Sequence, residues 1–381
     1  MEVKPILTMV YFSAFPSMHA AGPAGTIERL AEELSEYFNI TVISLNFDRS
    51  RREELFHNRD SVTTKRTGYN ILYLPYKFSS IFELYERLRK NQGSLTIHCL
   101  YDFRLSIPAL LISLLVRPRK KVVHLPHGIF MDVIQNKHQL RKRLFCSFLA
   151  WRPIRARVIH VASSPREMAE VKKRVGPNAR AVVIAHFASN FVRFLQQPQR
   201  EKVVGALTIA FVGRVVEQKN LIFAIEALAA AGVAAQLHVF GEASDNKYVR
   251  ECQRIVLERK VSELVIFRGM LTREMLLLEM SKMDLFFLPT RGENFGHAIL
   301  EALSIGLPVL LSTETPWNDV GTYQAGWTLD LVEREKFSAR IRSAFDADDE
   351  IWSRFREGAR RYAASKNNNP DLILAWRKVL D

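Results

Sequence analysis

Short apolar runs alternate with amphipathic stretches along most of this sequence. The runs have the length of buried strands, and apolar residues spaced three and four apart mark helices between them. Strands are predicted at residues 5–12, 40–45, 69–74, 95–100, 121–125, 158–162, 181–185, 207–212, 237–240, 265–267, 285–288 and 307–311. Helices are predicted at residues 26–38, 105–115, 296–305, 352–362 and 370–380, and from Pro165 onward with Ser164 as N-cap. This alternation predicts an α/β protein with parallel sheets.

In the second half, three predicted strands end at glycines that are 28 residues apart, Gly213, Gly241 and Gly269. A spacing of this size fits one strand plus one helix, so the repeat predicts a doubly wound sheet. Glycine has no side chain, and the backbone at these three turns can therefore approach a ligand closely.

Residues 284–320 read as a strand, a polar turn, a helix and a second strand. Glu293 lies in the turn and Glu301 inside the helix, eight positions later. In a parallel sheet such a turn lies at the carboxyl edge, where ligands bind and where helix N–H groups attract anions. Glu301 has small neighbours one helical turn away and is expected to have a hydroxyl or cationic partner. The alternative is that Glu301 is an ordinary exposed helix residue.

A second polar turn, at residues 213–220, carries Arg214 on its loop and Lys219 at the start of the next helix. Two cations and fixed N–H donors suit a diphosphate. On these residues alone, the alternative that both are surface charges of a basic protein stays open.

The two segments resemble one known family. Residues 293–309, ENFGHAILEALSIGLPV, resemble the E-x7-E signature of glycosyltransferase family 4, and residues 213–220 are similar to its G-R-x4-K-N pattern. Residues 315–320, TPWNDV, look like a variant from members that build bacterial cell-surface polysaccharide. The resemblance implies the α/β GT-B fold, in which two Rossmann-like doubly wound parallel-sheet domains face each other across a cleft. It also implies sugar transfer from a nucleoside-diphosphate sugar with retained anomeric configuration.

The first half matches the family less closely. His127 follows a predicted strand, at a point where the family carries a His-Gly pair whose histidine contacts the donor sugar; a structural histidine is the alternative. Gly22 and Gly25 lie at the first turn, where the family's loop approaches the donor diphosphate and the acceptor. A plain tight turn is the alternative there, and the dinucleotide fingerprint G-x-G-x-x-G is missing. His98 matches a weaker position of the family pattern, with the core favoured as its place, and residues 185–187 depart from the family's Pro-Asn-Gly.

The resemblance implies roles for individual residues. Arg214 and Lys219 would neutralise the leaving diphosphate, Glu301 would hold the ribose hydroxyls, and the backbone around Gly269 would lie beside the base. Glu293 and the backbone of residues 294–297 would face the donor sugar and diphosphate. The candidate catalytic residues are Arg214, Lys219, Glu293 and His127, and the candidate donor-binding residues are Gly213, Arg268, Gly269, Asn294, Phe295, Gly296, His297 and Glu301.

A chain of 381 residues commonly forms two domains. The polar passage 196–202 predicts the boundary between an N-terminal domain at residues 1–195, on the acceptor side, and a C-terminal domain at residues 203–365, on the donor side. Residues 366–381 are predicted to contain a helix that can cross back to the first domain.

The formal charge of +14 and the pI near 9.8 favour anionic ligands, acidic lipid surfaces or nucleic acid. Residues 140–157 interleave apolar side chains with cations, among them Arg141, Lys142 and Arg143, which suits an anionic membrane surface. The alternative is a core helix with a basic outer face. No signal peptide is expected, and the longest apolar run, residues 107–116, is too short to span a bilayer. The expected location is the cytoplasm, either in solution or peripheral on the inner face of the plasma membrane.

Neither a metal nor a cofactor is predicted. The three cysteines, Cys99, Cys146 and Cys252, lie far apart, which fits a reducing compartment and no zinc site. The D-x-D within residues 346–349 precedes a predicted helix, where acidic residues stabilise the helix start, so it is interpreted as capping.

Together with the family resemblance, the sequence predicts a metal-independent glycosyltransferase; the resemblance implies that it retains the anomeric configuration and acts on a hydroxyl of a glycan or lipid-linked acceptor. No protein nucleophile is evident, and a front-face displacement with the leaving phosphate as base is the working hypothesis. A nucleotide-sugar epimerase or hydrolase of the same fold is an alternative. A dinucleotide-dependent oxidoreductase lacks its fingerprint, and a nucleic-acid-binding protein would explain the charge, although no nucleic acid is the expected partner.

Overall fold

A computed structural model describes residues 3–13, 23–47, 53–57, 60–99, 102–117, 120–130, 139–187, 201–243, 246–367 and 370–381, without the side chains of residues 139–143, 246, 367 and 370. The chain divides into two compact units. Unit 1 comprises Met1–Ser189 and Asn369–Asp381, and unit 2 comprises Asn190–Asn368.

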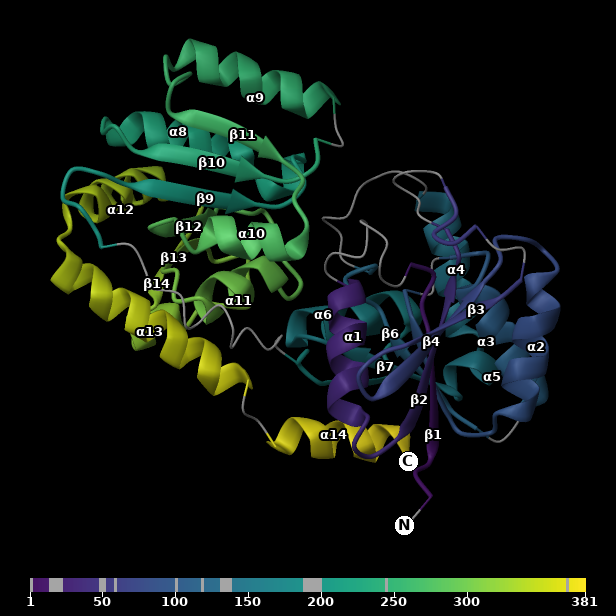
Figure 1. Cartoon of the computed structure of the whole chain (residues 1–381). Coiled ribbons are helices and arrows are strands. Elements are labelled where there is room, and N and C mark those ends of the chain that lie inside the picture. Colours follow the sequence, from purple (N-terminus) through teal and green to yellow (C-terminus); the bar gives the residue numbers. More distant parts are fainter. Residues whose placement is uncertain are drawn as a thin grey trace. The chain divides into compact units, whose positions relative to one another are not determined.

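Unit 1 is built on a mostly parallel sheet (Figure 1) of eight strands in the order β3-β4-β2-β1-β5-β6-β7-β8. All neighbouring strands are parallel except β3, which runs antiparallel to β4 at the edge. The strands are β1 (Ile6–Val10), β2 (Asn39–Leu45), β3 (Val62–Lys65), β4 (Tyr69–Leu74), β5 (Ser94–His98), β6 (Val122–Leu125), β7 (Val158–Ala162) and β8 (Arg180–Val183).

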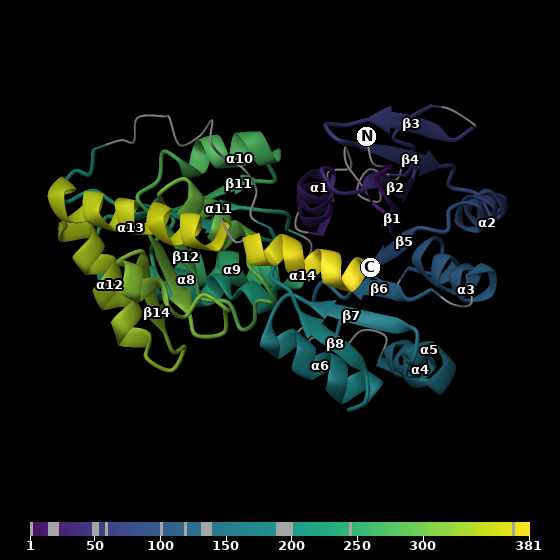
Figure 2. The same cartoon turned by 90° about the horizontal axis from the view of Figure 1, so that it is seen from below.

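Helices cover both faces of this sheet, because the connections run in opposite directions from β1. The helices are α1 (Pro23–Leu34), α2 (Ser80–Lys90), α3 (Ser106–Val116), α4 (Gln139–Ala150), α5 (Arg152–Arg155), α6 (Pro165–Val175) and α14 (Pro370–Leu380). Figure 2, seen from below, shows α1 and α14 on one side of the sheet and α2, α3 and α4 on the other. Each face therefore has its own hydrophobic core.

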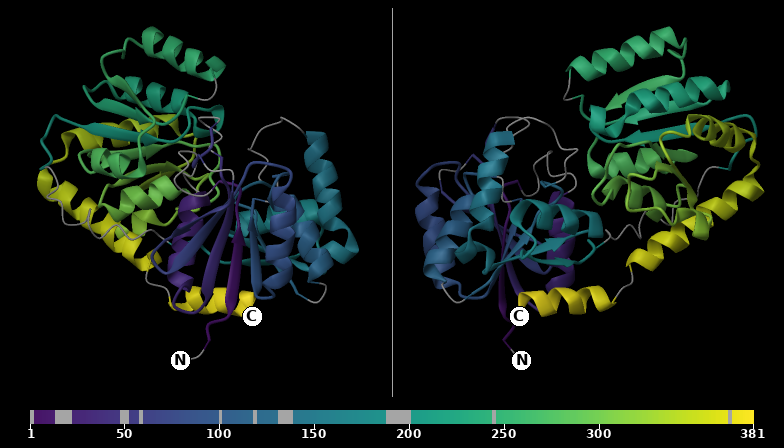
Figure 3. Two further views of the ribbon diagram at one scale, coloured as in Figure 1. Left: turned by 45° about the vertical axis from the view of Figure 1, so that its right-hand side comes forward. Right: turned by 180° about the vertical axis from the view of Figure 1, so that it is seen from behind.

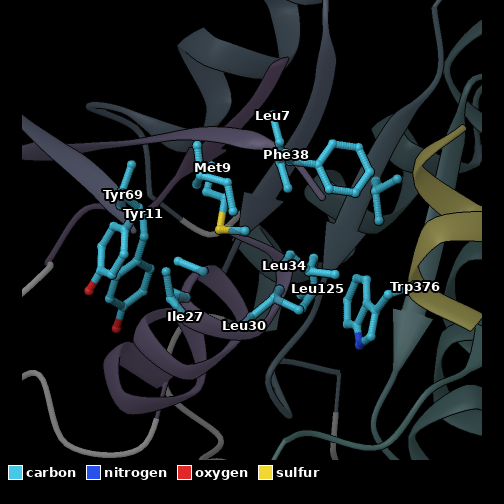
Figure 4. Packing of buried hydrophobic residues seen from close by; sticks show 14 of the residues in the cluster. Leu7, Met9, Tyr11, Ile27, Leu30, Leu34, Phe38, Tyr69, Leu125 and Trp376 are labelled. Carbon is cyan, nitrogen blue, oxygen red and sulfur yellow. The ribbon is translucent and has the colours of Figure 1, made fainter. Parts of the chain in front are cut away.

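The last helix of the chain belongs to unit 1. Trp376 of α14 is buried and lies beside Leu34 of α1 and Leu125 of β6 (Figure 4). The Ser94 hydroxyl at the start of β5 donates to the carbonyl of Leu380. Helix α14 thus lies at the end of the sheet where its central strands begin (Figure 3).

Unit 2 contains a six-stranded, fully parallel sheet with the order β11-β10-β9-β12-β13-β14. Counted from β9, this is the order 3-2-1-4-5-6 of doubly wound nucleotide-binding folds, and the connections change direction between β9 and β12. The strands are β9 (Thr208–Val212), β10 (Gln236–Phe240), β11 (Val265–Gly269), β12 (Leu285–Leu288), β13 (Val309–Ser312) and β14 (Gly326–Leu329). The helices are η2 (Glu217–Lys219), α8 (Leu221–Ala231), α9 (Asn246–Glu258), α10 (Arg273–Met280), α11 (His297–Ser304), η3 (Val320–Tyr323), α12 (Arg334–Asp346) and α13 (Asp349–Asn367).

Local sequence signals explain several element boundaries. The Ser164 hydroxyl accepts a hydrogen bond from the amide of Glu167 at 3.2 Å, with Pro165 in the first turn, as predicted for α6. Asp348 caps α13, because its carboxylate accepts from the amide of Ile351 at 2.9 Å. The interpretation of the D-x-D segment as capping is thereby confirmed.

Candidate functional site

Two loops of unit 2 lie at the point where its sheet changes winding direction. One follows β9 and leads into η2 and α8, and the other follows β12 and leads into α11. The two strands are hydrogen-bonded neighbours, with Ile209 opposite Leu285 and Ala210 opposite Phe286. In doubly wound sheets ligands bind at the carboxyl ends of the two strands that flank this point.

Hydrogen bonds fix these loops to each other. The amide of Arg291 donates to the carbonyl of Gln218 at 2.8 Å, and the Gln218 side chain donates to the carbonyl of Gly292 at 2.8 Å. Asn220, which adopts a left-handed conformation with φ of 61°, donates through Nδ2 to the carbonyl of Pro289 at 3.0 Å. The polar turns that sequence analysis singled out are therefore in contact.

Lys219 and Glu293 form an ion pair across the two loops, and their side chains are only 20% and 15% exposed. The Lys219 stem also packs against Gly213, where a Cβ atom would come within 3.2 Å of Lys219 Cε. Gly213 has a φ of 148°, so another residue would be both strained and crowded there. The ammonium group of Lys219 is thus held by the carboxylate of Glu293, and the carbon stem of Lys219 packs against Gly213.

The loop after β9 carries a second cation that faces solvent. Arg214 is exposed, and no ion pair joins it to any residue within the described ranges. Arg291, on the other loop, is also exposed but pairs with Glu217 at 2.6 Å. Arg291 is therefore held by an ion pair, whereas Arg214 has no ion-pair partner among the described residues.

The turn that leads into α11 is held by a tryptophan. Trp317 Nε1 donates to the carbonyl of Phe295, and the two rings meet edge to face at 5.6 Å. Gly296 is the N-cap of α11 with φ of 82°, and a Cβ there would approach Ile299 Cδ1 to 2.8 Å. His297 starts the helix; burial lowers its pKa to about 3, with the charges of Arg273 and Lys219 acting in the same direction. His297 is therefore neutral at pH 7.

Glu301 lies one turn further along α11 and has a cationic partner. Arg273 Nε and Nη2 lie 3.0 and 2.9 Å from Glu301 Oε1, and the Glu301 side chain is 12% exposed. Burial raises the pKa of Glu301, while Arg273 lowers it. The expected partner is confirmed, and the alternative of an exposed helix residue is wrong. Sequence analysis did not identify Arg273, the first residue of α10.

The three regularly spaced glycines end three adjacent strands. The amide of Gly213 donates to the carbonyl of Phe240, and that of Gly241 to the carbonyl of Gly269, both at 2.9 Å. A Cβ on Gly241 would lie 1.9 Å from the Gly213 oxygen. Arg268 beside Gly269 is exposed and donates to His238 Nδ1 at 3.2 Å. All three turns therefore lie at one edge of the sheet, as predicted.

In unit 1, His127 belongs to a group of three histidines at the ends of strands. His98 Nδ1 lies 3.0 Å from His127 Nε2, and His98 Nε2 lies 3.1 Å from the Thr96 hydroxyl. The ring of His186 stacks on that of His127 at 5.4 Å. His98 is fully buried, as expected, and burial lowers its pKa to about 3. His98 is not only a core residue, because it contacts the candidate catalytic histidine.

The turn after β6 that carries His127 has a strained backbone and contacts a buried carboxylate. His127 and Cys99 have φ values of 51° and 53°, which are unusual for residues other than glycine. Glu167, 1% exposed, accepts from the amide of Gly128 and from the amide and hydroxyl of Ser163, the latter two at 2.8 and 3.0 Å. These contacts hold the turn that presents His127.

The remaining predicted sites are less informative. Gly22 lies outside the described residues. Gly25 lies inside α1 and not in a loop before a helix, because Pro23 starts the helix three residues earlier than predicted. The side chains of Arg141, Lys142 and Arg143 also lie outside the described part of the chain.

Within the described part of the chain, no group of three or more His, Cys, Asp or Glu could hold a metal ion, and no helix is long and apolar enough to cross a bilayer.

The two sheets and their strand orders define the GT-B fold. Residues 192–362 match the family model of glycosyl transferases group 1. In full-length comparisons, the chain is similar to Anabaena Alr3699/HepE solved with UDP-glucose, at a TM-score of 0.73 and 13% identity over 99% of both chains. It is also similar to WaaG, a glycosyltransferase involved in lipopolysaccharide biosynthesis, at a TM-score of 0.65 and 14% identity over 98% of this chain and 99% of that one. At these identities the likeness shows the fold, and the predicted fold class is confirmed.

Two curated proteins match part of the sequence. One is an uncharacterised 41.2 kDa protein in the cps region of Klebsiella pneumoniae, 24% identical over 181 residues, which are 48% of this chain and 47% of that protein. The other is a 2-deoxystreptamine glucosyltransferase of Streptomyces kanamyceticus, 27% identical over 105 residues, which are 28% of this chain and 27% of that enzyme. The matches thus span about half and about a quarter of these relatives.

Proposed function

We propose that this protein is a retaining glycosyltransferase of family 4, which moves a sugar from a nucleoside-diphosphate sugar to a hydroxyl of a glycan or lipid-linked acceptor. The observation that carries the proposal is the grouping of Arg214, Lys219 and Glu293 on two loops at the switch point of unit 2. The family match over residues 192–362 falls on the unit that contains this group. Unit 2 is accordingly the donor-binding unit in this proposal, and unit 1 the acceptor-binding unit.

The chemistry of the group suits the departure of a diphosphate. When the bond between the sugar and the diphosphate breaks, negative charge grows on the leaving phosphate. Arg214 and Lys219 are the cations available on the loop after β9, and fixed cations lower the barrier because they need not reorganise. Interactions that strengthen as charge develops raise kcat, whereas uniform binding only lowers KM.

Glu293 is assigned to positioning and not to nucleophilic attack. Its carboxylate forms an ion pair with Lys219, so its charge is already compensated by a cation. A carboxylate in this state is a weak nucleophile. This arrangement favours the hypothesis that the leaving phosphate itself accepts the acceptor proton on the same face of the sugar.

Glu301 and Arg273 are assigned to the nucleoside. Glu301 would bind the ribose hydroxyls while Arg273 holds its carboxylate in place, and the backbone near Gly269 would contact the base. Two similar proteins support a role in cell-surface polysaccharide synthesis: WaaG is involved in lipopolysaccharide biosynthesis, and the Klebsiella protein is encoded in the cps region. Sugar transfer without a metal is part of the proposal.

The test is a thermal-shift panel of nucleoside diphosphates and their sugars, followed by mass spectrometry of products formed on lipid-linked acceptors. The expected result is that nucleotides of one base raise the melting temperature of the protein, and that sugar transfer continues when a metal chelator is added. Nuclear magnetic resonance of the new linkage should show a retained anomeric configuration. Consumption of the donor without any acceptor product would contradict the proposal and favour a hydrolase or epimerase.

A further inference from the structure

Helix α4 is apolar on two faces, and only one of them is used by the core. Phe145 and Leu149 are buried against the sheet of unit 1. Leu144 is 64% exposed, and Trp151, directly after the helix, is 62% exposed. The interpretation of this segment as a core helix is therefore correct for one face, and the other face needs a separate explanation.

The neighbouring helix α3 presents a matching row. Leu111 and Leu115 lie four residues apart on α3, with exposed fractions of 43% and 78%, and Phe103, 60% exposed, lies in the turn before this helix. Residues four apart lie on the same side of a helix, so Leu111 and Leu115 share one face of α3, and Phe103 lines the same hollow as Leu111. Single exposed apolar residues are common, but a contiguous row marks an interaction site.

The two rows enclose a groove of about 540 Å³. Every side chain that lines it is apolar, namely Phe103, Ile107, Leu111, Leu144, Phe145 and Phe148. A groove for a sugar or a nucleotide would contain hydrogen-bonding groups, and this one has none among its lining side chains. Its occupant should accordingly be hydrocarbon.

The charge of the surrounding sequence indicates which hydrocarbon surface fits. Residues 117–157 contain eleven lysines and arginines, and Asp132 is the only acid. Lys120, Lys121 and Arg152 are exposed cations of the described part of this stretch. A second copy of the chain would bring two basic regions together, which is unfavourable, whereas an anionic bilayer supplies the opposite charge.

We propose that the groove between α3 and α4, with the exposed side chains along its rim, docks on the surface of an anionic lipid bilayer. Leu115, Leu144 and Trp151 enter the headgroup and acyl boundary, and the exposed cations Lys120, Lys121 and Arg152 contact lipid phosphates. This mode of binding is peripheral, and it goes beyond the proposed sugar transfer because it does not depend on it. It would keep the protein next to any acceptor carried by a lipid.

The experiment is sedimentation of the full chain with vesicles of phosphatidylcholine containing about one third phosphatidylglycerol. The wild type should sediment with these vesicles and not with pure phosphatidylcholine. Leu144→Glu and Leu115→Glu should each reduce the bound fraction about tenfold, because each loses apolar burial and adds a repelled charge. Leu257→Glu is the matched control, since Leu257 is 69% exposed on α9 of unit 2.

Fluorescence provides a second readout. Trp151 is the most exposed of the five tryptophans, so a blue shift on adding vesicles should disappear in Trp151→Phe. Unchanged circular dichroism and unchanged stabilisation by the nucleotide would show that Leu144→Glu still folds. Equal sedimentation of Leu144→Glu and wild type would overturn the proposal. A wild-type dimer that Leu144→Glu splits, without any binding to vesicles, would also overturn it and assign the groove to a second copy.

Discussion

Lys219 and Glu293, 74 positions apart in the chain, form an ion pair that joins the loop after β9 to the loop after β12. The pair lies at the switch point of unit 2, so opposite charges meet where a doubly wound sheet binds its ligand. A bound diphosphate would compete with Glu293 for the same ammonium group. Lys219 is thus already held in place before a ligand arrives, and little conformational entropy remains to be lost on binding.

Lys219→Ala should lower kcat/KM about 100-fold to 1,000-fold, because a fixed charge at the leaving group is lost. If Glu293 acts by positioning this lysine, the double variant Lys219→Ala with Glu293→Gln should be no slower than Lys219→Ala. Steady-state kinetics with the donor found in the panel measure four proteins, namely the wild type, Lys219→Ala, Glu293→Gln and the double variant. Multiplication of the two single effects in the double variant would mean that Glu293 acts independently of Lys219.

Arg214→Ala should also reduce kcat/KM about 100-fold, and most of the loss should appear in kcat. The matched control is Arg291→Ala, which removes an exposed arginine paired with Glu217 from the neighbouring loop. That change should alter the rate less than about twofold, since exposed ion pairs contribute little. Similar losses in both variants would indicate a general effect of positive charge and not a specific contact by Arg214.

Gly241→Ala should destabilise the protein by more than about 2 kcal/mol, because backbone strain and a clash act together. Gly241 has a φ of 151°, and its new Cβ would lie 1.9 Å from the carbonyl oxygen of Gly213. Gly321→Ala is the control, since no atom lies within 4 Å of the corresponding Cβ. Urea unfolding gives both values, and equal stability of the two variants would contradict this account of the glycine spacing.

The sequence predicted buried elements far better than half-exposed ones. Strands β4, β7 and β12 have the predicted bounds because each is a short, largely buried run dominated by apolar residues. Strand β3, with the sequence VTTK, is only partly buried, and its antiparallel pairing at the sheet edge could not be predicted. Strand β14 is short and begins at Gly326, whose role as a site of close backbone contact with Val309 appears only in three dimensions.

In the candidate site, the sequence predicted the local turns but not the contacts between distant segments. The cationic turn and the carboxylate turn were found from local sequence because each carries its own pattern. Arg273 was missed because it comes from a third segment and reaches Glu301 only through the packing of α10 against α11. The contact between His98 and His127 was missed for a similar reason, since it joins the ends of β5 and β6.

Arg273→Ala should make stability depend more steeply on pH. Burial raises the pKa of Glu301, and Arg273 opposes that rise. A carboxyl whose folded pKa exceeds its unfolded value binds more protons in the folded state, so stability falls as pH increases through that range. Without Arg273 the pKa of Glu301 should rise further, and the free energy of unfolding should decline more between about pH 4.5 and pH 7 than in the wild type.

The control for this prediction removes the titrating group itself. In Arg273→Ala with Glu301→Gln no carboxyl titrates at this position, so the extra decline with pH should disappear even though the arginine is still absent. Urea unfolding at several pH values measures the slope for the wild type, the single variant and the double variant. If the single and double variants show the same slope, the pH effect does not come from Glu301. In that case Arg273 stabilises α10 and α11 by packing and not by its charge.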